Sequence, residues 1–357
     1  MAVYTTIDDP SVHFQTALYT GNGSTQSITN DGNSDLQPDL LWIKSRSDSS
    51  FHAWTDSTRG TSKRIYSNSA SAEESHADRV TAFGSDGFSL GSSSLVNTNT
   101  YNYVAWQWKA NGGTTASNSV GDIDSVVQAN TDSGFAIVTY TGNGSANQTI
   151  GHGLGAVPKM VLFKNRSSGQ YWYVYHVVTG NNTMLYFNLT NAAQSLSSQF
   201  STPTTTTFNV SNENSTFSGY NTSGNTYVAY VFAEVQGYSK FGKYTGSGGT
   251  GVTAPFVYTG FKPAFVLFKK SSDSGDNWMM YDNKRSDSNG NVVDRALHPN
   301  SSAAEYDNAN ANLDILSNGF KLRSSFGWVN QNTHTYIYMA FAENPFVTST
   351  GIPATAR

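Results

Sequence analysis

The chain has 357 residues, a length that predicts two or three domains. Charged residues make up only 13% of the chain, and aromatic residues also reach 13%, a share too high for a disordered protein. The net charge of -4 and the scattered Lys and Arg residues argue against nucleic-acid binding, and the lack of cysteine excludes disulfides and thiolate metal sites.

The first residues, 1–11, are predicted to form a short N-terminal arm. They lack the basic and apolar regions of a signal peptide, and no window of the chain approaches 18 consecutive apolar residues. We therefore expect a soluble protein that is made without a secretion signal and is not inserted in a membrane.

Three marker segments then recur in the same order, first about 120 and then about 105 residues apart. The opening turns are Tyr19-Thr-Gly-Asn-Gly23, Tyr140-Thr-Gly-Asn-Gly144 and Tyr244-Thr-Gly-Ser-Gly248. Apolar runs follow at Pro38, Pro158 and Pro263, and closing runs begin at Tyr103, Tyr227 and Tyr336. Such self-similarity predicts a protein built from repeats.

The markers place the three repeats at 12–110 (repeat 1), 134–236 (repeat 2) and 237–346 (repeat 3). Repeats of this length are longer than solenoid units, so each is expected to have its own core. The stretch 111–133, which begins with a run of Gly, Thr and Ser, is predicted to be a flexible linker. The last residues, 347–357, are predicted to be a C-terminal tail.

Within each repeat, short runs of Val, Ile, Tyr, Phe and Thr alternate with clusters of Gly, Asn, Asp and Ser. This pattern is typical of strands and turns. Only the stretch 303–316 resembles a helix. We therefore predict an all-β protein of three tandem antiparallel domains, each a β-sandwich or a jelly-roll-like unit.

Residues with catalytic or metal-binding chemistry form no known motif in this sequence. The seven His residues show no ligand spacing and no retention between repeats, so we predict no metal site, no catalytic residue and no cofactor. The acids that recur are Asp56 with Asp282, Glu73 with Glu305, and Glu234 with Glu343. A structural role as turn caps or arginine partners, such as Asp56 with Arg59, is favoured over catalysis because an enzyme seldom needs its active site in several copies.

One run is a candidate binding surface, Tyr171-Trp-Tyr-Val-Tyr-His176. As a strand it places Trp172 and every second residue after it on one face, which is expected to be core. Tyr171, Tyr173 and Tyr175 then share the other face and form a candidate aromatic platform for sugar or protein contacts. The alternative is that this Tyr face packs against a neighbouring repeat or subunit.

Several segments of repeat 1 carry a resemblance. They include Asp56-Ser-Thr-Arg-Gly60, Phe83-Gly-Ser-Asp-Gly-Phe-Ser-Leu-Gly91 and Tyr103-Val-Ala-Trp-Gln-Trp, together with the opening turn. This series resembles a domain that recurs in virion proteins of marine tailed bacteriophages, including cyanophages, which are described as tail-fibre-like or structural. The similarity is best over 12–110, and it implies a component of a virus particle.

From this resemblance we expect a fibre-like or adhesin-like appendage on the virion surface that contacts host glycans, synthesised in the bacterial cytoplasm. The alternative is an architectural capsid decoration or connector protein without a host ligand, with the two terminal segments as docking arms. Other virion proteins are the expected partners. A homo-oligomer, with a trimer as its form, is expected by analogy with phage fibres.

Overall fold

The computed structural model describes residues 4–181, 183–195, 201–211, 218–286, 291–307 and 311–354, and it confirms the all-β prediction. Over the described residues, every pair of named strands is antiparallel, and helices are confined to single turns. No helix among these residues is long and apolar enough to cross a membrane.

The strands and helices follow the repeats. Repeat 1 contains η1 (Pro10–Val12), β1 (Phe14–Thr20), β2 (Gln26–Ile28), β3 (Leu40–Ser45), β4 (Ala53–Asp56), β5 (Lys63–Tyr66), β6 (Glu74–Ser75), β7 (Val80–Gly84), β8 (Gly87–Leu90), α1 (Ser94–Asn97) and β9 (Asn102–Trp108). Two strands follow before repeat 2, namely β10 (Ala116–Asn118) and β11 (Ser125–Asn130).

The other two repeats contain a similar series of elements over the described residues. Repeat 2 contains β12 (Phe135–Thr141), β13 (Gln148–Gly151), β14 (Pro158–Asn165), β15 (Tyr173–His176), β16 (Thr183–Tyr186), β17 (Gln194–Ser195), β18 (Thr207–Val210), η2 (Ser218–Tyr220) and β19 (Thr226–Ala233). Repeat 3 contains β20 (Ser239–Thr245), η3 (Gly251–Thr253), β21 (Phe256–Tyr258), β22 (Phe261–Lys270), β23 (Met279–Asp282), β24 (Arg295–Ala296), β25 (Tyr306–Asp307), β26 (Leu313–Leu316), β27 (Gly319–Leu322), α2 (Gly327–Asn330) and β28 (Thr335–Pro345).

Each repeat packs a large sheet against a small one. The large sheet of repeat 1 has the strand order β1-β9-β3-β4-β5-β6, and its small sheet is β2-β8-β7. In repeat 2 the order recurs as β12-β19-β14-β15-β16-β17, extended beyond β12 by β11 and β10, and the small sheet is the pair β13-β18. In repeat 3 the first four positions recur as β20-β28-β22-β23, and the small sheet is β21-β27-β26. The equivalent residues Phe88, Phe208 and Phe320 of the small sheets are buried toward the large sheets, so all three repeats have the same sandwich plan.

The recurring Tyr-Thr-Gly turn has a steric cause. The first Tyr stacks on the Tyr that opens the closing strand, with ring centroids 5.1, 4.9 and 4.8 Å apart in repeats 1, 2 and 3. The chain then passes so close to the loop before the closing strand that a Cβ on Gly21 would overlap the carbonyl oxygen of Thr98. The glycines at the same place in the other repeats, Gly142 and Gly246, meet carbonyl oxygens in the same way, which accounts for the retained Gly.

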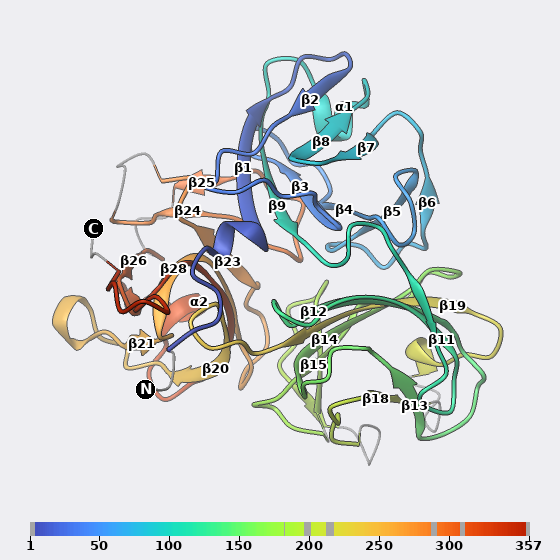
Figure 1. The fold of residues 1–357 in the computed structure, drawn as a ribbon. Coiled ribbons are helices and arrows are strands. Elements are labelled where there is room, and N and C mark those ends of the chain that lie inside the picture. Colours follow the sequence, from blue (N-terminus) through green and yellow to red (C-terminus); the bar gives the residue numbers. More distant parts are fainter. Residues whose placement is uncertain are drawn as a thin grey trace.

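The three repeats lie around a common centre (Figure 1). Buried apolar side chains from all three fill this centre, which the sequence did not predict. In each large sheet, the face that points away from the small sheet of the same repeat packs against the other two repeats. Trp108, Phe232 and Phe341 hold equivalent positions in the three closing strands. Their ring centroids lie 5.6 to 6.4 Å apart, so each of the three rings contacts the other two.

Equivalent backbone hydrogen bonds close the ring of repeats. The bonds run from Glu73 N to Arg166 O (3.0 Å), from Ala193 N to Ser271 O (2.9 Å) and from Glu305 N to Arg46 O (3.0 Å). They join repeat 1 to 2, repeat 2 to 3 and repeat 3 to 1 through the same positions. Such a closed ring of like contacts is a threefold arrangement within a single chain.

The segments outside the repeats depart from the predictions. The predicted linker 111–133 contains β10 and β11, and β11 pairs along its whole length with β12. The flexible-linker prediction is therefore wrong for these strands, because Val127 and Gln128 bury their side chains and repay the ordering of the segment. The helical interpretation of 303–316 is also wrong, since β25 and β26 lie there.

The N-terminal arm is ordered against the end of repeat 2 and against repeat 3. Ile7 is buried in the shared centre, Thr5 Oγ1 donates to Gln236 O over 2.9 Å, and the Tyr4 hydroxyl donates to Gly260 O over 2.6 Å. The arm therefore leads into the first repeat while it packs against the last. The residues named here are bound to the body of the protein and do not form a free docking arm.

Candidate functional site

The predicted aromatic platform does not exist as a surface. Tyr173 and Tyr175 are 2% and 3% exposed, because they lie between the large and the small sheet of repeat 2. Only Tyr171 is exposed, at 44% of its surface, and its ring packs edge-on against Tyr186. The platform is therefore corrected to a sandwich core with one exposed ring beside it.

The other face of the same strand meets repeat 1. Trp172 is fully buried in the shared centre, as the alternation predicts for a core residue, and its ring centroid lies 5.2 Å from that of Trp54. Its indole N–H donates to the Tyr66 carbonyl of repeat 1 over 2.7 Å. The inter-repeat contact proposed for the Tyr face thus belongs to the Trp face.

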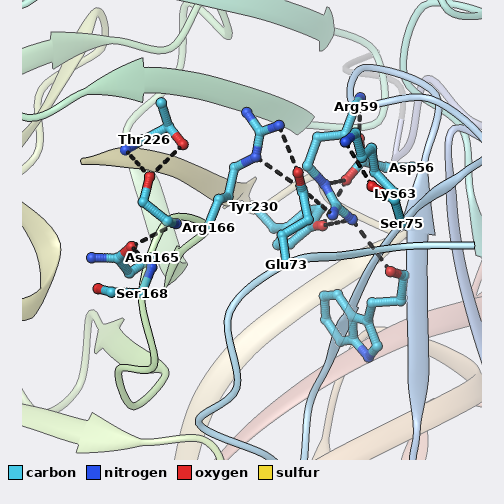
Figure 2. A network of polar contacts seen from close by, with 12 residues as sticks. Asp56, Arg59, Lys63, Glu73, Ser75, Asn165, Arg166, Ser168, Thr226 and Tyr230 are labelled. Atoms are coloured by element: carbon cyan, nitrogen blue, oxygen red, sulfur yellow. Dashed lines mark hydrogen bonds and ion pairs between the residues drawn. The ribbon is translucent and has the colours of Figure 1, made fainter. Parts of the chain in front are cut away.

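A buried network of charged side chains crosses the interface between repeats 1 and 2 (Figure 2). In repeat 1 the Arg59 guanidinium lies 2.5 Å from Asp56 Oδ2 and 2.9 Å from Glu73 Oε2. From repeat 2, Arg166 donates two hydrogen bonds of 2.9 Å to the two carboxylate oxygens of Glu73. The Tyr230 hydroxyl, also from repeat 2, donates to Asp56 Oδ2 over 2.7 Å.

Burial and charge pairing oppose each other in this network. Burial alone would raise the pKa of the Glu73 carboxyl, but the hydrogen bonds from Arg166 and the charge of Arg59 hold it below its ordinary value. Burial likewise works against the charged form of Arg59, and the Asp56 carboxylate overcomes it and keeps the pKa of Arg59 above its ordinary value. The network therefore pairs two arginines with two carboxylates inside the protein.

The same network recurs between repeats 3 and 1. Arg285 lies 2.6 Å from Asp282 and 2.8 Å from Glu305, and Arg46 of repeat 1 donates two hydrogen bonds to Glu305. The indole N–H of Trp106 takes the place of the Tyr230 hydroxyl and donates to Asp282 over 2.9 Å. The recurring acids Asp56, Asp282, Glu73 and Glu305 are thus arginine partners.

The interface between repeats 2 and 3 has none of these charges at the same positions. His176, Thr179, Ala193 and Ser271 stand where the other interfaces have Asp, Arg, Glu and Arg. The backbone hydrogen bond between Ala193 and Ser271 is nevertheless retained. The four charged positions have therefore been replaced together while the backbone contact stays.

A neutral histidine replaces the acid at this third interface. Burial lowers the pKa of His176 to about 4. Its Nδ1 accepts from Val178 N, so its Nε2 carries the proton and donates to the Tyr338 carbonyl of repeat 3, 3.2 Å away. One hydrogen bond from a neutral side chain thus substitutes for the charged network.

Each repeat has a buried lysine at the same position, and in repeats 2 and 3 this lysine also bonds to the neighbouring repeat. Lys44, Lys164 and Lys269 occupy the same position in the three repeats. Lys164 Nζ donates to Ala70 O of repeat 1 over 3.0 Å, and Lys269 Nζ donates to Thr190 O of repeat 2 over 3.1 Å. Burial lowers the pKa of Lys164 to about 7 and those of Lys44 and Lys269 to about 8.

The hollows on the described surface include two that are lined by many polar side chains. Cleft A, of about 540 Å³, follows β10, β11 and β12 and is lined among others by Asn118, Asp124, Thr139, Thr141 and Arg166. Cleft B, of about 420 Å³, lies between β1 of repeat 1 and the ends of β23 and β28 of repeat 3. It is lined among others by Gln15, Thr16, Asn283, Lys284 and Glu343.

The arrangement offers binding surfaces and structural ion pairs. Among the described residues, no group of three or more His, Asp or Glu side chains is placed to hold a metal ion. The last recurring acids, Glu234 and Glu343, pair with Lys240 and Lys262 at 2.7 and 3.0 Å. The described geometry therefore gives no support to a pair of free carboxylates for glycosidic cleavage.

Sequence reasoning missed Arg46 and Arg166. Both stand at the ninth position of the Pro-led marker, where repeat 3 has Ser271. In repeats 1 and 2 this Arg meets a glutamate of the neighbouring repeat, whereas Ser271 of repeat 3 meets Ala193. The signal in the sequence was that the Asp, Arg, Glu and Arg positions of one interface are either all charged or all uncharged.

Comparison with known proteins places the chain in a family. No curated protein and no solved structure matches the sequence. A family model for a domain of unknown function, DUF7483, matches residues 9–345. The match runs across all three repeats, so the family's domain corresponds to the whole threefold body. The chain belongs to the DUF7483 family of domains of unknown function.

Proposed function

We propose that this chain is a structural protein of a bacteriophage particle and serves there as a rigid architectural block, either a connector or a capsid decoration. The resemblance of repeat 1 to virion proteins of tailed phages supports the setting. One observation supports the role. The three repeats pack around a single aromatic centre, where Trp108, Phe232 and Phe341 contact one another.

The physical reason is rigidity. Shared burial removes the freedom that separate domains on linkers would keep, because the repeats cannot rotate without exposing the aromatic centre to water. The buried ion networks oppose the same motion, since pulling Arg166 from Glu73 removes the carboxylate partner of Arg166 and leaves Glu73 with Arg59 alone. A body of this kind suits a part that transmits load or fixes spacing in an assembly.

Antibody labelling of intact particles tests the proposal. Gold label spread evenly over the head or gathered at the neck, seen by electron microscopy, is the expected result. Label on distal tail filaments would contradict the architectural role. Serum absorbed with the recombinant chain serves as the control, because it must lose the label at every location.

Cleft A favours a second candidate role, the contact with host glycans. Its hydroxyl, amide and carboxylate groups match the hydrogen-bonding needs of a saccharide, and shallow sites of this kind bind weakly unless several copies act together. Binding of fluorescent recombinant chain to host cells is the test, with Asp124→Ala and Thr141→Val combined to disable the cleft. Binding that this double variant loses supports the adhesin role, and unchanged binding contradicts it.

A further inference from the structure

We infer that the outer edge of β1 accepts an extended segment of another polypeptide, which adds to the large sheet of repeat 1 as an antiparallel strand. That the partner is a virion protein rests on the proposed function. The binding surface itself follows from the structure alone. Comparison of the three equivalent edges of the large sheets carries the argument.

The first strands of the repeats, β1, β12 and β20, are equivalent, yet their outer edges differ. In repeat 2 the edge of β12 is paired with β11 over six residues, from Ser125 opposite Tyr140 to Asn130 opposite Phe135. In repeats 1 and 3 the named sheets end at β1 and β20. An end strand presents N–H and C=O groups that can pair with a further strand.

The edge of β20 is protected by charge. Its sequence, Ser-Lys-Phe-Gly-Lys-Tyr-Thr, contains Lys240 and Lys243, and the Phe241 N–H donates to the Glu234 carboxylate. Lysine on an end strand is a common device against strand pairing, because an added strand would have to cover the charge. Repeat 3 is therefore not expected to take a partner strand.

The edge of β1 carries no charge, and none of the described strands covers it. Its sequence, Phe-Gln-Thr-Ala-Leu-Tyr-Thr, has no ionisable group besides one Tyr, and Leu18 is 39% exposed at the position of Lys243. Lys109 N donates to His13 O and Gly21 N to Tyr101 O, so odd-numbered residues of β1 bond to β9. The N–H and C=O groups of the even-numbered residues, Leu18 among them, then point outward.

Cleft B lies beside this edge and has its equivalent in repeat 2, where β11 fills it. Gln128 stands opposite Ile137, and its amide bonds to Ser57 and Thr58 of repeat 1. The equivalent of Ile137 in repeat 1 is Thr16, whose Oγ1 is buried and has no hydrogen-bond partner among the described residues.

Across cleft B, the equivalents of Ser57 and Thr58 are Asn283 and Lys284. The cleft thus has the polar walls of the filled site without the side chain that fills it. An amide side chain placed opposite Thr16 would face Asn283 and Lys284, as the Gln128 amide faces Ser57 and Thr58 in repeat 2. The residue of the partner segment opposite Thr16 is therefore Gln or Asn.

The register of β11 defines the rest of the partner segment. Ser125, Val126, Val127 and Gln128 oppose the equivalents of Tyr19, Leu18, Ala17 and Thr16 in turn. The partner segment is therefore extended and uncharged, with two neighbouring β-branched or apolar residues followed by Gln or Asn. Backbone bonds supply most of the affinity, and the amide in cleft B supplies the register.

A labelled peptide tests the inference. The probe is fluorescein-linked Asp-Ser-Val-Val-Gln-Ala-Asn-Thr, the sequence of 124–131, titrated with the full chain and followed by fluorescence anisotropy. We expect saturable binding with a Kd of about 1 mM or below. Leu18→Lys, which copies the protection of β20, should weaken it at least about tenfold, a change of about 1.4 kcal/mol. Lys243→Arg on β20, which keeps the protecting charge there, is the control and should leave the affinity unchanged.

Further measurements locate the probe. Hydrogen exchange should slow in the peptide that covers 14–20 when the probe is present, and Leu18→Pro should abolish binding by removing one outward N–H. Binding that survives both Leu18 variants would mean exchange with β11 and would overturn the inference, as would absence of saturable binding.

Sedimentation of the chain without the probe completes the test. Self-association that Leu18→Lys abolishes would name a second copy as the occupant and overturn the proposed partner. A monomer at the same concentration is the expected result. No virion is involved in these experiments, so their failure is distinct from failure of the architectural role.

Discussion

Four charged residues decide what kind of contact joins two neighbouring repeats. Where Asp, Arg and Glu of one repeat meet Arg of the next, the charges neutralise one another inside the protein, as with Asp56, Arg59, Glu73 and Arg166. Where one of them is missing, the remaining charges would be buried without partners. Such a set is retained or lost as a whole, which explains why the interface of repeats 2 and 3 has lost all four.

Truncation of Glu73 measures the contribution of one network. Glu73→Ala leaves Arg59 and Arg166 without their shared carboxylate and is expected to lower the free energy of unfolding by about 3 to 5 kcal/mol. Glu305→Ala should have a similar effect at the equivalent interface. Glu234→Ala, which breaks a half-exposed pair with Lys240, is the control and should cost below about 1 kcal/mol. Urea denaturation that shows equal losses for Glu73→Ala and Glu234→Ala would contradict this account.

The buried lysines predict a pH dependence of stability. In the folded protein the pKa of Lys164 is about 7, well below its unfolded value, so the unfolded chain binds more protons between pH 7 and the unfolded pKa. Stability should therefore rise from about pH 7 to about pH 9.5, by at most about 1.4 kcal/mol per pH unit for each lysine. Lys164→Met should reduce this slope, measured by urea denaturation at several pH values. Lys243→Met, at an exposed position, should leave the slope unchanged.

At the scale of elements, β11 shows how a polar segment becomes part of a sheet. Its residues Val127 and Gln128 bury their side chains, and its backbone completes the hydrogen bonding of β12. The composition of 111–133 favoured a flexible linker because Gly and Ser are frequent at its start. Alternation of buried and exposed residues over only six positions is too short a signal to outweigh that composition.

Gln128→Leu tests whether β11 is structural. The Gln128 amide accepts hydrogen bonds from Asn111 N and Gly113 N and bonds to two hydroxyl groups of repeat 1, so its loss leaves several buried polar groups unpaired. The expected loss of unfolding free energy is about 3 kcal/mol. Val126→Thr, on the exposed face of the same strand, should change it by below about 0.5 kcal/mol. Equal behaviour of the two variants in urea would restore the linker interpretation.

Most strands and turns of one repeat could be predicted from the sequence. Which part of the protein covers each face of a strand could not. The Tyr-Thr-Gly turns and the Pro-led runs mark real strands and turns in every repeat. For the strand of Trp172, alternation separated the two faces correctly. Both faces turned out to be buried, one in the sandwich and one in the shared centre, and alternation alone cannot say which partner covers each face.

At the scale of the whole molecule, the three repeats form one body. Trp108, Phe232 and Phe341 meet at the centre from three repeats, and their side chains would be exposed to water in an isolated repeat. The threefold arrangement lies within one chain, and association of chains into a trimer stays a prediction. The repeats were visible in the sequence, while their mutual packing depends on contacts between residues more than 100 positions apart, such as Trp172 with Tyr66.

Differential scanning calorimetry of the full chain tests the central claim, that three repeats share one core, most directly. Because the shared centre draws on all three repeats, we predict a single transition whose calorimetric and van't Hoff enthalpies agree. Three transitions, or a calorimetric enthalpy about three times the van't Hoff value, would show repeats that unfold independently and would contradict the claim.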